Sequence, residues 1–111
     1  MKLLIVVINK TEFVPDIIST LVELNVRGMV VLESENVVHF LAQEVSIFVG
    51  LRELIQPTRS HNKMIFSYTD NSNILKDLYE MLKKIKIDLT SSGMGYALVI
   101  NIDEIVEGPE E

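Results

Sequence analysis

Two short polar segments of the sequence have the residue types that bind an anion. Gly93-Met94-Gly95 precedes an apolar segment, and glycines at this spacing allow backbone N–H groups to form an anion-binding nest. The alternative is a connecting turn that needs glycine for positive φ angles. Arg59, His61 and Lys63 form the most basic local cluster, which either supplies cationic ligands or is a solvated loop.

The histidines and acidic residues offer a weaker case for a metal site. His39 and His61 are 22 positions apart, and Glu33, Glu35 and Glu44 carry additional oxygen ligands. A metal site needs several converging ligands, which this spacing does not predict. We therefore favour a structural or solvated role for both histidines and predict no metal site.

Catalytic motifs are sparse. A Ser-His-Asp triad can be assembled on paper from Ser60, His61 and Asp70, but no nucleophile elbow supports it. The chain has no cysteine, so it has no thiolate nucleophile. It also lacks a P-loop and a dinucleotide-binding fingerprint. We predict that the protein is not an enzyme.

Length and composition limit the remaining classes. A chain of 111 residues that is 48% hydrophobic can form one domain with a core. Its net charge of -6 argues against nucleic acid, which needs a basic surface. The most apolar stretch, residues 37–55, contains Glu44, Arg52 and Glu53, which disfavour insertion in a membrane. The apolar segment at residues 3–8 is too short for a signal peptide, so we expect a cytoplasmic protein.

The hydrophobic periodicity predicts an α+β fold. Strands are expected at residues 3–8, 29–33, 64–68 and 96–102, the last extending as far as Val106, and helices at 15–24 and 74–85. Gly28 is expected in the turn that ends the first helix. This order is typical of a ferredoxin-like antiparallel sheet with two helices on one face. A partly helical insertion is expected at about 34–62, and an acidic, solvated tail at about 107–111.

Both faces of this sheet are predicted to be apolar. The first strand places Leu3, Ile5 and Val7 on the face opposite Leu4, Val6 and Ile8, and the fourth strand is apolar on both faces as well. Because the helices cover one face, the other must be covered by the insertion or by further copies of the chain. We favour self-association.

Three segments resemble the PII signalling superfamily. Residues 23–33 (ELNVRGMVVLE) are similar to the family's helix-to-strand signature ELGIKGMTVTE. Residues 93–100 (GMGYALVI) resemble GDGKIFVI, and residues 103–106 (DEIV) fall where the family has EEAV. The resemblance covers about two-thirds of the chain, all but the insertion.

The resemblance implies a non-catalytic homotrimer that binds an adenine nucleotide or related ligand in clefts between subunits. It implies ligand contacts at Gly28, Met29 and Val30 and at Gly93-Met94-Gly95. A loop after the second strand would then bind a protein target, namely a transporter, an enzyme or a regulator. The chain departs from the family at three phosphate-binding cations: Tyr96 replaces a lysine, and Glu107 and Pro109 replace two arginines.

Three further expectations concern the site. We expect the third and fourth strands to start at opposite ends of the sheet, so that Arg59 and Gly93 could share a ligand only across a subunit boundary. Residues 45–55 either dock a partner through Phe48, Leu51 and Leu54 or pack within the trimer. The alternative functions are a trimeric metal-binding protein similar to the CutA family and a small enzyme that uses an intersubunit cleft.

Overall fold

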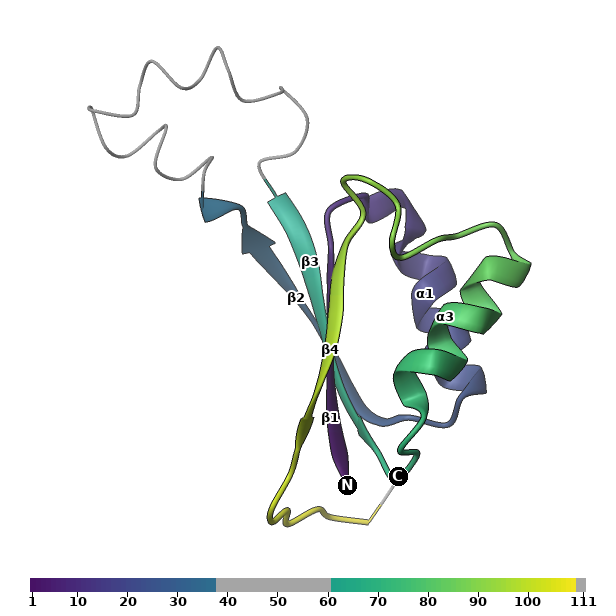
Figure 1. Ribbon diagram of the computed structural model, residues 1–111. Helices are drawn as coiled ribbons and strands as arrows, with labels where there is room; N and C mark the ends of the chain where they lie inside the picture. The colour runs from purple at the N-terminus through teal and green to yellow at the C-terminus, as the bar shows by residue number, and fades with distance from the viewer. Residues whose placement is uncertain (38–60, 110–111) are drawn as a thin grey trace.

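A computed structural model describes residues 1–37 and 61–109. Its elements are β1 (Lys2–Ile8), a 3-10 turn (Thr11–Phe13), α1 (Val14–Glu23), β2 (Arg27–Glu35), β3 (His61–Thr69), α3 (Ile74–Lys84) and β4 (Gly95–Asn101). The strands form one antiparallel sheet in the order β2-β3-β1-β4 (Figure 1). The predicted α+β class is confirmed, and the four-stranded antiparallel sheet with two helices is compatible with a ferredoxin-like arrangement.

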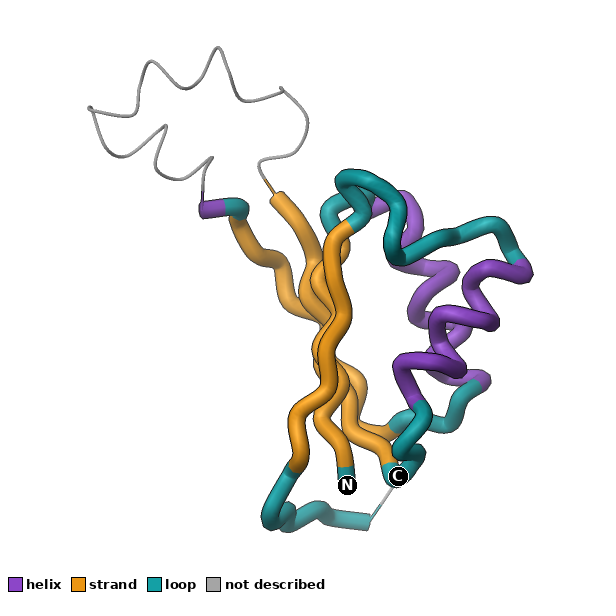
Figure 2. Tube along the Cα trace, in the orientation of Figure 1, coloured by secondary structure: helices purple, strands orange, loops and turns teal. Residues whose placement is uncertain are grey.

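Both α-helices of the described residues lie on the same side of the sheet (Figures 1 and 2). Apolar residues recur at helical spacing in α1 and α3 and are buried against β1 and β3. The most deeply buried members of this core are Leu4, Val6, Ile8, Ile17, Leu21, Ile65, Ile74, Leu78 and Leu82. Within the described ranges, no helix has the length and hydropathy needed to cross a membrane.

The strands that flank the predicted insertion are longer than expected. Ser34 and Glu35 belong to β2, and they pair with Asn62 and His61 of β3. The polar loop predicted up to Asn62 is therefore wrong at its end, because the ladder continues through polar side chains that hydrogen-bond across it. The helical segment predicted at residues 45–55 lies outside the described residues, as do the partner-contact candidates Phe48, Leu51 and Leu54.

Two other boundaries differ from the prediction. α1 ends at Glu23, and the left-handed residue after it is Asn25 (φ 59°), while Gly28 already lies within β2. β4 ends at Asn101 and does not reach Val106. The following residues 102–109 cross the end of the sheet beside the N-terminus (Figure 1); we call this segment the strap.

Candidate functional site

The sheet face turned away from the helices is apolar across all strands. Directly opposite residues of an antiparallel ladder project to the same face. Leu3, Ile5 and Val7 of β1 each lie opposite one residue of β3 and one residue of β4. The β3 residues lie in turn opposite residues of β2. Together this surface, here called the open face, comprises Leu3, Ile5, Val7, Val30, Leu32, Met64, Phe66, Tyr68, Tyr96, Leu98 and Ile100.

Several side chains of the open face are strongly exposed in the single chain. Val30, Ile100 and Tyr96 expose 49%, 50% and 55% of their surface. Covering an apolar side chain of this kind contributes about 1.5–3 kcal/mol when its burial becomes complete. Contiguous apolar patches bordered by polar groups are typical of interaction surfaces. The prediction that the sheet is apolar on both faces is thus confirmed.

The starts of β3 and β4 lie at the same end of the sheet. Lys63 of β3 and Gly95 of β4 are both paired with Ile8, one on each side of β1. The expectation that they lie at opposite ends is wrong. Because β3 and β4 are each antiparallel to the β1 strand between them, they run parallel to each other and start together. The Gly93–Gly95 turn and the first residues of β3 therefore lie near one another within one chain.

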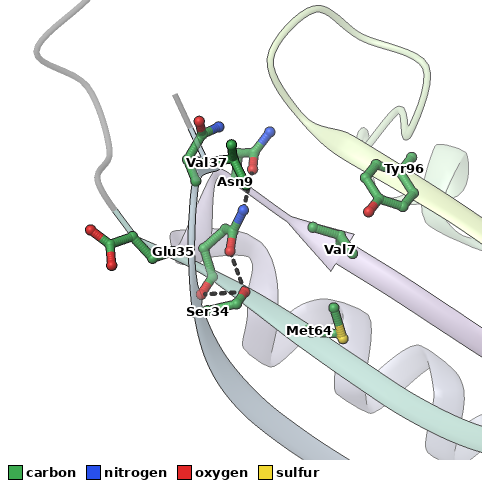
Figure 3. A pocket seen from close by; sticks show the side chains of 9 residues that line it. Val7, Asn9, Ser34, Glu35, Val37, Met64 and Tyr96 are labelled. Carbon is green, nitrogen blue, oxygen red and sulfur yellow. Dashed lines mark hydrogen bonds between the residues drawn. The ribbon is translucent and has the colours of Figure 1, made fainter. Parts of the chain in front are cut away.

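A cavity of about 270 Å³ opens on the open face at this end of the sheet. Val7, Met64 and Tyr96 supply apolar walls from three strands. Asn9, Ser34 and Asn62 border it with amide and hydroxyl groups. Figure 3 shows Tyr96 across the cavity from Asn9, and the carboxylate of Glu35 pointing away from both.

The three polar side chains are joined to one another. The Asn62 amide donates a hydrogen bond to Asn9 Oδ1 at 3.1 Å, and the Ser34 hydroxyl donates to Asn62 Oδ1 (Figure 3). We call these residues the polar ladder. It spans β2, β3 and the end of β1, so the strand pairing holds its groups in place. Sequence analysis missed it, because a lone amide at the end of a strand gives no signal until its cross-strand neighbours are known.

The predicted cationic ligands lie on the other side of the sheet. Side chains alternate along a strand, so Asn62 and Met64 face the cavity while His61 and Lys63 face the helix side. Lys63 is paired there with Glu33 at 3.3 Å. The third member of the predicted cluster, Arg59, lies outside the described residues.

Both glycines of the Gly93–Gly95 turn have backbone conformations that side chains disfavour, and Gly95 also leaves no room for one. Both have positive φ angles, and a Cβ at Gly95 would lie 1.9 Å from the Val7 carbonyl oxygen. Met94 is buried in the core, and its carbonyl accepts a hydrogen bond from the Asn9 N–H at 2.8 Å. These contacts explain the glycines structurally, as the connecting-turn interpretation requires.

Gly28, Met29 and Val30 lie far from the cavity. They stand at the start of β2, where Arg27 pairs with Tyr68, whereas the cavity lies where Glu35 pairs with His61. The structure therefore brings the Gly93–Gly95 turn and the start of β3 together and leaves the Gly28 segment at the opposite end. In one chain the predicted ligand residues form two separate groups.

A network of polar contacts holds the strap at that opposite end. The guanidinium of Arg27 contacts Asp70 and Glu107 at 3.1 Å each and lies 5.4 Å from the centre of the Tyr68 ring. The Tyr68 hydroxyl donates a hydrogen bond to the other Glu107 oxygen at 2.7 Å. Glu107, the first residue of the predicted solvated tail, is exposed, and its carboxylate is bound by two partners.

The structure does not bring together the residues considered for a catalytic triad or for a metal site. His61 and Asp70 flank opposite ends of β3, a strand of nine residues that spans about 3.3 Å per residue, so they cannot form a triad. Ser60, His39 and Glu44 lie outside the described residues. Within residues 1–37 and 61–109, no group of three or more His, Asp or Glu side chains could hold a metal ion.

No protein-family model matches the chain, and no curated protein matches it.

Proposed function

We propose that the chain is a non-catalytic, PII-like regulatory protein that assembles as a homotrimer through its open face. In this proposal it binds a small anionic ligand such as an adenine nucleotide at the boundary between subunits and relays its presence to a partner protein. The observation that carries the proposal is the open face, an apolar surface of all four strands that the described residues of one chain leave uncovered.

Three further features support this function. The sheet order and the helices on one face fit the fold that the sequence resemblance implies. β2 ends and β3 begins beside the cavity, so a ligand there would contact the ends of both strands. The cavity is bordered by a polar ladder with no acid–base pair among its described residues, a composition suited to binding rather than to proton transfer.

The test of the assembly is the molar mass in solution. Light scattering is expected to give three times the chain mass of 12.6 kDa at micromolar concentration. Leu98→Glu places a charge on the open face midway along the edge strand β4 and should dissociate the trimer. Val22→Glu is the matched control, because Val22 on α1 is 58% exposed on the helix side and should leave the trimer intact. A wild-type protein that remains a single chain would refute the proposal.

The test of ligand binding is a thermal-shift series with AMP, ADP, ATP and cyclic nucleotides. A ligand that binds only the folded state raises the melting temperature by mass action, by an amount that grows with its concentration. A concentration-dependent shift with at least one nucleotide is expected. If no nucleotide shifts the melting temperature, the nucleotide-binding part of the proposed function is contradicted. The proposed trimer would still be tested separately by the molar mass in solution.

A further inference from the structure

The cavity on the open face differs in chemistry from the anion site that the sequence predicts. Its walls are the side chains of Val7, Met64 and Tyr96, and its border is the polar ladder of Asn9, Ser34 and Asn62. Among the described lining residues, Glu35 alone carries a charge, and that charge is negative. This environment suits an uncharged ligand with one apolar surface and one hydrogen-bonding edge.

The strand register explains why none of the described residues of these walls is a cation. Lys63 and His61 are neighbours of Asn62 in β3, but alternation directs their side chains to the helix side. Lys63 is also neutralised there by Glu33 at 3.3 Å. A one-residue shift of register would exchange the two faces, so the pairing of Asn62 with Ser34 decides the charge of the cavity.

Tyr96 supplies the surface best suited to a planar ligand. It is opposite Val7 at the cavity end of the open face and is 55% exposed in the single chain, so its ring can form one wall of a site at the subunit boundary. Stacking of a heterocycle on an aromatic ring is worth about 1–3 kcal/mol by alanine substitution, or about 5- to 150-fold in affinity. The amides of the polar ladder can hydrogen-bond the edge of such a heterocycle.

We propose that this cavity takes the uncharged nucleoside part of the ligand and that the phosphate groups contribute little to affinity. The inference rests on the proposed nucleotide-binding function and specifies which part of the ligand the chain recognises. A site built around cations would show the opposite dependence, because charge-assisted hydrogen bonds to phosphate are among the strongest contacts.

Isothermal titration calorimetry with adenosine, AMP and ATP tests the proposal. The dissociation constants of the three are expected to agree within about threefold, and Tyr96→Ala is expected to weaken the binding of each by about fivefold or more. Lys63→Gln is the matched control, since Lys63 lies next to Asn62 in the chain but on the other side of the sheet; it should change no affinity. Circular dichroism establishes that both variants are folded.

The possible outcomes separate this inference from the proposed function. ATP that binds at least tenfold more tightly than adenosine, or ATP binding that Lys63→Gln weakens, would overturn the inference and leave the function standing. Adenosine binding that Tyr96→Ala does not change would also overturn it, because the ligand would then lie elsewhere. If none of the three binds, both the inference and nucleotide binding are refuted.

Discussion

The phenol ring of Tyr68 occupies the space that a side chain at Gly28 would need. A Cβ built at Gly28 would lie 2.2 Å from Tyr68 Cε1, and the backbone there has a φ angle of +62°. The glycine at this position is therefore explained by packing and backbone conformation within one chain.

Gly28→Ala is expected to destabilise the protein by about 2–4 kcal/mol, because it adds a left-handed backbone penalty to overpacking against the ring. Urea denaturation measures this change. In a Tyr68→Ala background, Gly28→Ala should lower the free energy of unfolding by less than it does in the wild type. The Tyr68 substitution removes the clash with the ring, but the backbone strain at position 28 remains. Gly108→Ala is the control, because nothing lies within 4 Å of the Cβ position there. Equal effects at positions 28 and 108 would contradict the explanation.

Glu107→Ala should release the strap from Arg27 and Tyr68. Glu107, Arg27 and Tyr68 are all exposed or half-buried, so the expected loss of stability is about 1 kcal/mol or less. The loss should shrink in about 0.5 M salt, because screening weakens the ion pair in the wild type. Glu104→Ala, which alters an exposed carboxylate three residues earlier, should have a smaller effect. A loss at Glu107 that salt leaves unchanged would argue against the ion pair.

Ser67→Ala is expected to leave stability unchanged within about 0.5 kcal/mol or to increase it. The Ser67 hydroxyl is buried in the core and has no hydrogen-bond partner in the part of the chain that the structure describes. Removing an unsatisfied polar group relieves its desolvation cost. Thr69→Val is the comparison, since it has nearly the same shape and loses the oxygen that accepts the Asn71 N–H at 3.1 Å.

Thr69→Val should therefore cost about 1 kcal/mol, measured by the same chemical denaturation. A large loss at Ser67 and none at Thr69 would show that the hydrogen bonding of these two hydroxyls has been assigned the wrong way round.

The pKa of Asp88 is lowered from its usual value. The principal cause is the hydrogen bond from the Thr90 hydroxyl, followed by the bond from the Thr90 N–H, with a smaller contribution from the charge of Lys83. Thr90→Ala should raise this pKa towards the usual value, and Lys83→Gln should raise it less. Carboxyl NMR titration measures both shifts.

The sign of the pH dependence follows from the depressed pKa. Any stability that Asp88 contributes is present above its unfolded-state pKa and is lost as the pH falls through its lower folded-state pKa. Thr90→Ala should narrow the pH range between the folded-state and unfolded-state pKa values of Asp88, over which this stability is lost. An Asp88 pKa that is the same in wild type and Thr90→Ala would rule out the hydroxyl as the main cause.

Much of the fold could be predicted from local sequence patterns. Alternation in residues 3–8 identified both faces of β1, and the helical spacing of Ile74, Leu78 and Leu82 identified the buried side of α3. These predictions succeeded because the periods of strands and helices are properties of the backbone itself. Boundaries were harder, since His61 and Asn62 have polar side chains that suggest a loop until their partners in β2 are known.

The sequence by itself determined that the sheet would have two apolar faces, because alternating side chains cannot all point towards one layer of helices. Tertiary structure alone decided which segments meet. Antiparallel pairing on both sides of β1 brings Lys63 and Gly95 to the same end of the sheet, and the register places Asn62 on the cavity side and Lys63 on the other. Such relationships depend on contacts between residues far apart in the chain, and no local pattern specifies them.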